Sequence, residues 1–298
     1  MEYVKAIILG IVQGLTEFLP ISSSGHLSLF QHFMGMSGEG SLMLTVFLHI
    51  GTLIAVVAVY YKTFWKLLKE IGFFLRDLFT GKLFRKDQEI TDDRHLLYMM
   101  FISCLPLLLL FVPLGGDMNV KDYVERLSED DDILLEGFCF LFTSILLFTG
   151  VYVSRTAKNI RSRVEMKDAW IIGFAQVLAA AFPGVSRSGS TISAGMLRKV
   201  DKDVMVEYSF VLGTPAVLAA SLVEMKDAVE GGLVGISVGP LLVGVATAAA
   251  FGILAIQLLK WMVNKDKFTF FAYYCLILAT LTIAAGCYEH VTGNLLQF

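Results

Sequence analysis

Residues 182–191 read Phe-Pro-Gly-Val-Ser-Arg-Ser-Gly-Ser-Thr and set one arginine among small and hydroxyl-bearing residues, inside a chain that is otherwise strongly apolar. An arginine at the centre of a membrane costs about 2.5–3.5 kcal/mol on insertion scales, so it is tolerated only where it is buried with a partner. Glycines let the backbone turn its N–H groups toward a ligand, and the guanidinium of Arg187 matches phosphate in shape. The stretch therefore predicts an anion site, with a helix that starts near Thr191 and points its positive end inward.

The composition indicates that the rest of the chain lies in a bilayer. Hydrophobic residues account for 56% of its 298 residues and charged residues for 17%, and the mean hydropathy is +0.68. These values are too apolar for an ordinary soluble domain. The four cysteines show no C-x-x-C spacing, so we expect neither disulfides nor a cysteine metal cluster. We expect membrane lipids as partners and no nucleic acid.

Six stretches are long enough to cross about 30 Å of hydrocarbon as helices. They are residues 42–61, 96–114, 135–154, 204–223, 239–261 and 268–288. Two further apolar regions, residues 4–36 and 169–197, are interrupted by the polar loops 20–26 and 183–191. Irregular backbone at membrane depth is tolerated only where protein or a water-filled cavity satisfies its polar groups. We therefore predict an all-α, polytopic membrane protein with six full transmembrane helices and two re-entrant helical hairpins.

Loop charges orient this arrangement. Residues 62–94 and 155–167 are rich in lysine and arginine, so the positive-inside rule predicts that both are cytoplasmic. Acidic residues gather in residues 117–136 and 224–230, which we assign to the opposite side. The second hairpin then enters the membrane from the cytoplasm and the first from the outside. Both termini are predicted to be extracytoplasmic.

Hairpins on opposite faces predict an internal repeat of inverted topology, and the sequence contains one. The matching residues share an offset of 163 and are Gly10, Gln13, Pro20 and Ser23 with Gly173, Gln176, Pro183 and Ser186. The Gly-Thr pair at residues 51–52 recurs at residues 213–214, one residue out of step. We predict a single membrane domain, residues 1–298, with repeat units of about residues 1–154 and 155–298.

The first polar loop supplies the chemistry that the second one lacks. Gln13 and Glu17 are four residues apart, so they share one face of a helix. Beyond them come three serines and one histidine, Ser22, Ser23, Ser24 and His26. A carboxylate, hydroxyl nucleophiles and an imidazole are together typical of a catalytic site.

Each of these residues also has a structural explanation. Glu17 and Arg187 would hold two helices together as an ion pair, the serines would cap the helix that follows them, and His26 would be a packed interior histidine. His49 and His290 have no carboxylate or hydroxyl companion nearby in the sequence, and we assign them to packing or to the surface.

At these residues the chain resembles the undecaprenyl-diphosphate phosphatase family of the bacitracin-resistance type. Two motifs carry the resemblance, Gln13-Gly-Leu-Thr-Glu17-Phe-Leu-Pro20-Ile-Ser22-Ser23-Ser24-Gly25-His26 and Pro183-Gly184-Val-Ser186-Arg187-Ser188-Gly189-Ser190-Thr191-Ile-Ser193. It implies an enzyme of the bacterial plasma (inner) membrane that removes the terminal phosphate from undecaprenyl diphosphate, recycling the lipid carrier of cell-wall synthesis and giving bacitracin resistance. It also implies a divalent cation (Mg²⁺ or Ca²⁺), a site open to the extracytoplasmic side, and a homodimer.

Carried onto this sequence, the resemblance implies that Glu17, Ser23, His26 and Arg187 are catalytic. The phosphate-binding residues that it implies are Ser22, Ser24, Gly184, Ser186, Arg187, Ser188 and Thr191. Glu17 would bind the metal together with residue 13, although Gln13 supplies one negative charge fewer than an acid would. Ser23 would attack the terminal phosphorus while His26 or Glu17 takes its proton, and direct attack by water is the alternative.

A transporter or flippase for an anionic, phosphate-bearing substrate is the main alternative function. Inverted repeats with broken helices are common among secondary transporters. A transporter needs no nucleophile, so the cluster of Glu17, Ser23 and His26 favours a hydrolase.

Overall fold

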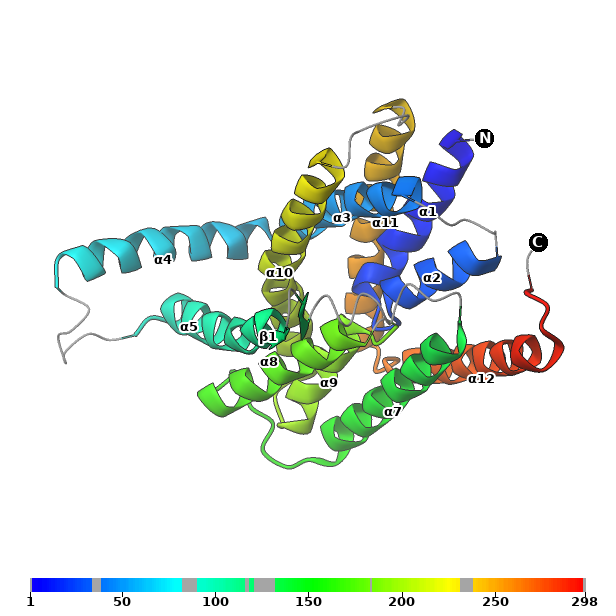
Figure 1. Cartoon of the computed structure of the whole chain (residues 1–298). Coiled ribbons are helices and arrows are strands. Elements are labelled where there is room, and N and C mark those ends of the chain that lie inside the picture. Colours follow the sequence, from blue (N-terminus) through cyan, green and yellow to red (C-terminus); the bar gives the residue numbers. More distant parts are fainter. Residues whose placement is uncertain are drawn as a thin grey trace.

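The computed structural model describes residues 2–33, 39–81, 90–115, 118–120, 132–182, 184–230 and 238–296. Most of these residues are helical, and a short antiparallel pair of strands, β1 (Pro113–Gly115) and β2 (Met118–Asn119), adds the remaining regular structure (Figure 1). The predicted all-α class is therefore correct apart from this strand pair. Pro183, the end of the first predicted hairpin and most of the acidic segment 117–136 lie outside the described residues.

Five helical stretches in the described residues are long and apolar enough to cross a membrane. They are α5 with its continuation η2 (together Asp92–Phe111), α7 (Leu134–Thr156), α10 (Lys202–Glu230), α11 (Val238–Asn264) and α12 (Thr269–Thr292). A sixth candidate consists of α3 (Glu39–Val59) and α4 (Tyr61–Phe79), joined at a bend of 88°. Each stretch overlaps a predicted span, so the chain is a polytopic helical membrane protein.

The span predicted over residues 96–114 changes helix type along its length. α5 (Asp92–Cys104) gives way to the 3-10 helix η2 (Leu105–Phe111), which has Pro106 in its first turn. Proline lacks an N–H group and its ring clashes with the carbonyl one turn earlier, so regular α-helical bonding does not pass this point.

Residues 62–94, predicted to be a cytoplasmic loop, include the 19-residue helix α4. The prediction of a loop is wrong here, because charged residues that follow a helical period describe an amphipathic helix just as well as a loop. The chain turns sharply at Tyr60, between α3 and α4, and α4 then extends away from the other helices beside α5 (Figure 1).

Helices break at both predicted polar loops. α1 (Glu2–Phe18) is followed by α2 (Ser23–Phe33), and α8 (Met166–Ala181) is followed by α9 (Arg187–Leu197). The prediction that the helix after the second polar loop starts near Thr191 is wrong. Oγ of Ser186 accepts a hydrogen bond from the backbone N–H of Gly189 at 3.0 Å and caps the helix earlier, so Arg187 is its first residue.

Glycines allow α1 to lie directly against α11. A Cβ atom at Gly10 would lie 2.8 Å from the carbonyl oxygen of Gly244, and one at Gly14 would lie 2.6 Å from that of Ala248. Small residues at such positions let helix backbones approach closely inside a membrane protein. This contact fixes the height and rotation of α1, and so the position of Glu17 near its end.

A buried carboxylate closes the base of the α8–α9 hairpin. Asp168 is fully buried and accepts hydrogen bonds from Arg161 at 2.6 and 3.1 Å and from Arg198 at 2.9 Å. Burial raises the pKa of the Asp168 carboxyl, but the bonds from Arg161, the Glu165 backbone and Arg198 outweigh it, so the pKa lies below its ordinary value. The clamp ties the two ends of the hairpin that carries Arg187.

We expect Asp168→Asn to lower the free energy of unfolding by about 1.5–3 kcal/mol, because Arg161 and Arg198 would lose the buried carboxylate that accepts their charged hydrogen bonds, while Arg161 keeps its ion pair with Glu165. Thermal unfolding in detergent measures the loss. Arg163→Ala is the control, because its pair with Asp92 is 3.9 Å long and exposed, and such pairs contribute less than about 1 kcal/mol.

The contacts of Asp168 also predict how the stability of the protein depends on pH. Because the folded-state pKa of Asp168 is depressed, its contribution is complete above about pH 4 and is lost as pH falls through the folded-state pKa. The stability of Asp168→Asn should therefore change less than that of the wild type on acidification. Equal melting of the two proteins at pH 7 would contradict the clamp.

Candidate active site

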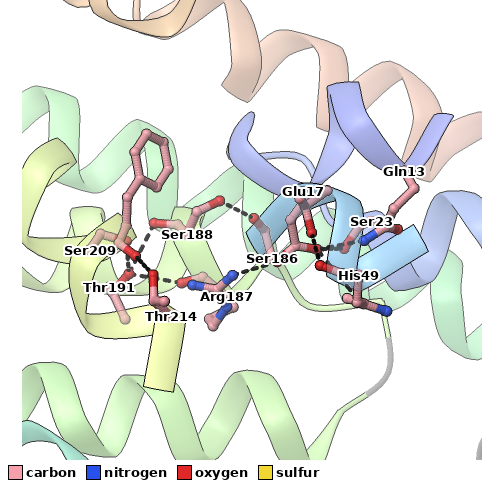
Figure 2. A network of polar contacts seen from close by, with 12 residues as sticks. Gln13, Glu17, Ser23, His49, Ser186, Arg187, Ser188, Thr191, Ser209 and Thr214 are labelled. Carbon is pink, nitrogen blue, oxygen red and sulfur yellow. Dashed lines mark hydrogen bonds and ion pairs between the residues drawn. The ribbon is translucent and has the colours of Figure 1, made fainter. Parts of the chain in front are cut away.

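Glu17 lies at the centre of a cluster of polar side chains from different helices. Its Oε1 accepts a hydrogen bond from Nη2 of Arg187 at 2.5 Å, and its Oε2 accepts one from Oγ of Ser23 at 2.6 Å (Figure 2). Nε2 of Gln13 donates to Oε2 at 3.1 Å, and Nε2 of His49 lies 3.9 Å from the same oxygen. Only 8% of Glu17 is exposed, so these groups rather than bulk water stabilise its charge.

Two helix N-termini meet at this carboxylate. Oγ of Ser22 accepts a hydrogen bond from the N–H of Gly25 at 3.2 Å, and Ser186 caps α9 through Gly189 in the same way. α2 and α9 therefore both start at the breaks, and their first residues are Ser23 and Arg187. The N-terminal end of a helix carries partial positive charge and binds anions. The arrangement suits a ligand with more negative charge than one carboxylate supplies.

The two polar loops, separated by about half the chain, are in direct contact. The N–H of Gly184 donates to Oγ of Ser24 at 3.3 Å, and a Cβ atom at Gly25 would lie 3.0 Å from Cα of Gly184. Gly184 has a φ of +95°, which only glycine adopts without strain. The predicted halves of the site thus lie side by side.

His26 points away from the Glu17 carboxylate. Its Nδ1 lies 2.6 Å from the carbonyl oxygen of Ser22 and its Nε2 lies 2.7 Å from the hydroxyl of Tyr274, on which the imidazole ring also stacks. Ser22 has a φ of 72°, which is unfavourable for a residue other than glycine. His26 therefore stabilises the strained turn before Ser23. Glu17 is the base within hydrogen-bonding distance of the Ser23 hydroxyl.

The other predicted phosphate-binding hydroxyls are engaged with protein. Oγ of Ser188 donates to the carbonyl of Leu19 at 3.2 Å, and Oγ1 of Thr191 lies 2.6 Å from Oγ of Ser209 in α10. Ser186, Ser188 and Thr191 are all buried. Ser23, Ser24 and Arg187 are at least partly exposed, so they are the side chains that a substrate can reach first.

A small cavity borders the ion pair, and its walls include residues outside the two polar loops. It is lined by Glu17 and Arg187, by Thr52 of α3, and by Gly213 and Thr214 of α10. Its volume is about 10 Å³, room for about one water molecule and not for a diphosphate. A phosphate group can bind here only if the guanidinium and the carboxylate move apart.

Gly213, Thr52 and His49 lie at the candidate site, although none of them is among the predicted site residues. A Cβ atom at Gly213 would collide with the guanidinium of Arg187, so any larger residue on α10 would force the guanidinium to shift. The repeated Gly-Thr pair was a usable signal for Gly213 and Thr52. His49 lies near Glu17 only because α3 packs against α1, and no sequence pattern marks that contact.

The donor atoms near Glu17 can be compared with those that a divalent cation requires. Among the described residues, no three His, Cys, Asp or Glu side chains form a metal-binding group. Oε1 of Gln13, however, is buried and has no hydrogen-bond partner there. Mg²⁺ is usually bound through one or two carboxylates plus substrate phosphates. Glu17 and Gln13 therefore fit a cation that arrives with a diphosphate.

Known proteins match this chain over almost its whole length. The family model of the bacitracin resistance protein BacA matches residues 6–281. A protein from Halothermothrix orenii named undecaprenyl-diphosphatase is 36% identical over 285 residues, covering 95% of this chain and 98% of that protein. Undecaprenyl-diphosphatase 4 from Bacillus thuringiensis (strain Al Hakam) is 35% identical over 294 residues, covering 98% and 100%.

A double-mutant cycle measures the ion pair at the centre of the site. Glu17→Gln or Arg187→Gln alone leaves one buried charge without its partner, and we expect each to lower stability by about 3 kcal/mol. The double variant should lose less free energy of unfolding than the two single variants lose together, and the difference, the coupling energy, should be about 1–3 kcal/mol.

The exposed pair of Arg155 and Asp266, 3.0 Å apart, provides the matched control. The cycle of Arg155→Gln and Asp266→Asn should give a coupling below about 1 kcal/mol. Additive effects of Glu17→Gln and Arg187→Gln would mean that the two charges are stabilised independently.

Proposed function

The chain belongs to the family of the bacitracin resistance protein BacA, and we propose that the cluster around Glu17 and Arg187 is the catalytic centre at which it hydrolyses undecaprenyl diphosphate. The enzyme is an undecaprenyl-diphosphate phosphatase, and its products are undecaprenyl phosphate and inorganic phosphate. One observation carries the assignment of the site: a serine hydroxyl and an arginine guanidinium, each at the start of a helix, meet on one buried carboxylate.

Ser23 is the nucleophile of this proposal and Glu17 is its base. The hydroxyl already donates to the carboxylate at 2.6 Å, so the proton moves to Glu17 as Oγ attacks the terminal phosphorus. The bond from phosphorus to the bridging oxygen breaks, and undecaprenyl phosphate leaves. Glu17 gives its proton to the departing phosphate and is ionised again. It then takes a proton from the water that hydrolyses the phosphoserine, and this proton returns to Oγ of Ser23 as inorganic phosphate is released. Direct attack by water activated by Glu17 is the alternative route.

Arg187 changes its anionic partner during this reaction. In the structure Arg187 neutralises Glu17, and a bound phosphoryl group would offer its planar guanidinium a second, bidentate partner. When Glu17 takes the proton it becomes neutral, and the positive charge of Arg187 acts on the phosphoryl oxygens. The N-termini of α2 and α9 contribute in the same direction.

His26 positions the nucleophile in this proposal rather than taking its proton. Both of its ring nitrogens are engaged, with Ser22 and Tyr274. A divalent cation, Mg²⁺ or Ca²⁺, held by Glu17, Gln13 and the substrate phosphates would supply additional neutralisation of phosphate charge.

The finer architecture that we propose is an inverted repeat with two re-entrant hairpins, α1–α2 and α8–α9. Packing supports it. Gly10 faces the carbonyl of Gly244 in α11, while its repeat partner Gly173 faces the carbonyl of Ser103 in α5, each at a separation that excludes a Cβ atom. The first helix of each hairpin therefore packs on a span of the other half.

The two helix caps support the repeat in a modified register. Ser22 bonds to Gly25 and Ser186 bonds to Gly189, so the caps align Ser22 with Ser186 at an offset of 164 instead of 163. Ser23 then corresponds to Arg187. The two halves provide nucleophile and phosphate anchor from equivalent positions.

The site is proposed to open to the extracytoplasmic side, with both termini on that side. The basic residues of α4 and of the segment 155–167 support this orientation through the positive-inside rule. An undecaprenyl tail is stabilised in lipid by about 0.8 kcal/mol per buried CH₂, so the substrate enters sideways with its diphosphate directed at the loops. The homodimer remains an expectation from the family resemblance.

A transporter or flippase is the second candidate function. The ion pair between two broken helices would suit an anion gate. The contact between Ser23 and Glu17 favours the hydrolase, because passage of an anion requires neither a nucleophile nor its base.

Phosphate release from undecaprenyl diphosphate by purified protein in detergent tests the proposal. We expect Arg187→Ala to lower kcat about 10²–10³-fold, as for loss of one donor to a developing oxyanion, and Glu17→Ala to lower it by about 10²–10⁴-fold. A chelator should reduce release, and added Mg²⁺ or Ca²⁺ should restore it.

Ser190→Ala is the matched control, because Oγ of Ser190 is buried on α9 without a hydrogen-bond partner in the described residues. It should retain wild-type release. Full activity of Arg187→Ala would refute the phosphate site. Activity that survives in Ser23→Ala would exclude the phosphoserine route and leave direct attack by water.

Gly213→Ala tests the position of Arg187 without changing any polar group. The added methyl group must displace the guanidinium, and a displacement of about 1 Å can lower kcat/KM about 10²-fold. Gly72→Ala in α4 is the control, since a Cβ atom there meets no atom within 4 Å. Equal kcat/KM for both variants would show that Arg187 tolerates displacement.

A further inference from the structure

α4 directs many of its large apolar side chains away from the protein. Five of them, at spacings of three, four or seven residues, form one exposed stripe, and they are Tyr61, Trp65, Leu68, Leu75 and Phe79. Their exposed fractions run from 46% for Leu75 to 86% for Phe79. In a helix at the surface of a soluble protein this stripe would face the core.

The side of α4 that faces the protein carries buried carboxylates beside the buried Leu67. Glu70 and Asp77 are buried, and they bind Arg94 of α5 at 2.6 and 2.9 Å. α4 is thus held to the body of the protein by this ionic contact and by the packing of Leu67, and its exposed apolar stripe is left for another apolar medium.

Four exposed basic residues form a row beside the apolar stripe: Lys62, Lys66, Lys69 and Arg76. Three of them lie over exposed aromatic rings of the same helix, Lys62 over Tyr61, Lys69 over Trp65 and Arg76 over Phe73, at 5.9, 5.4 and 5.1 Å. Lys66 also lies 3.6 Å from Asp93. Aromatic rings with basic side chains alongside them are typical of helices at a membrane surface.

The direction of α4 agrees with such a location. α4 is bent by 88° relative to α3. If α3 crosses the bilayer, α4 runs nearly parallel to the membrane plane, and Figure 1 shows it extending away from the other helices along α5.

We propose that α4 lies in the membrane surface, with its apolar stripe in the boundary between headgroups and acyl chains and its basic row bound to anionic phospholipid headgroups. The charge favours this occupant over a second copy of the chain, because pairing two copies through α4 would bring two basic rows together. Basic residues beside an interfacial apolar face add electrostatic attraction to anionic lipid. The proposal is independent of the catalytic assignment.

Fluorescence of the full-length protein in lipid nanodiscs tests the position of α4. Single cysteines replace Leu68, Leu75 or Lys62 in a Cys287→Ser background, since the three remaining native cysteines are buried or only partly exposed. Each carries an environment-sensitive probe. Labels at Leu68→Cys and Leu75→Cys should emit at shorter wavelength and be quenched several-fold more by spin-labelled lipid than by iodide. The label at Lys62→Cys should show the opposite preference.

The charge part of the proposal is tested with the label at Leu68→Cys in nanodiscs of phosphatidylcholine with and without phosphatidylglycerol. Quenching by spin-labelled lipid should increase with the anionic lipid. Lys62→Gln, Lys66→Gln and Lys69→Gln together should abolish the increase and leave hydrolysis of undecaprenyl diphosphate unchanged. The control removes the same charge from exposed positions elsewhere and combines Lys158→Gln, Lys167→Gln and Lys265→Gln. In this control the increase in quenching with phosphatidylglycerol should persist.

Two outcomes would overturn the proposal. Strong quenching of the Leu68 and Leu75 labels by iodide would mean that the stripe faces water. Probes shielded from both quenchers, together with efficient disulfide formation between copies of unlabelled Leu68→Cys, would mean that a second chain covers it. If spin-labelled lipid quenches the Leu68 label equally with and without phosphatidylglycerol, α4 lies at the membrane surface but its basic row does not bind anionic headgroups.

Discussion

The ion pair between Glu17 and Arg187 is the interaction on which the rest of the structure depends. Neither charge is tolerated alone at a buried position in a membrane protein, so each requires the other. The residues are 170 positions apart in sequence, and the pair joins the end of α1 to the start of α9. The glycine contacts of α1 with α11, the caps of α2 and α9, and the clamp on Asp168 all bring these two charges to the same point.

The main features of the fold follow from the sequence because lipid leaves few choices. A long apolar run in lipid must form a helix, and the polar groups of an interruption within it must be satisfied by protein. The order of apolar and polar residues therefore locates both helix breaks. The exceptions have local causes. Pro106 changes the helix type within a span, and Ser186 starts α9 four residues early through its cap. The prediction of a loop over α4 fails because it uses the number of basic residues and not their helical spacing.

The candidate site was predictable in its ingredients but not in its contacts. Glu17, Ser23 and Arg187 stand out as polar groups in apolar surroundings, and the structure brings them together. Tyr274 and His49 do not stand out, because a tyrosine or a histidine in a membrane helix is ordinary until its spatial neighbour is known. The same limit applies to His26, since its bond to Tyr274 links residues 248 positions apart.

The pair of Glu17 and Arg187 also explains how a charged site can persist where its substrate is a lipid. A buried arginine without an anion would be costly, and Glu17 provides that anion until a diphosphate arrives. Substrate binding then exchanges one anion for another at Arg187, so little net desolvation is added. The exchange frees Glu17 to act as a base only when a phosphoryl group is present. Because the resting cavity has room for about one water molecule, the carboxylate and the serine stay paired with each other in the absence of substrate. The interaction that stabilises the resting fold is therefore the one that substrate binding must replace.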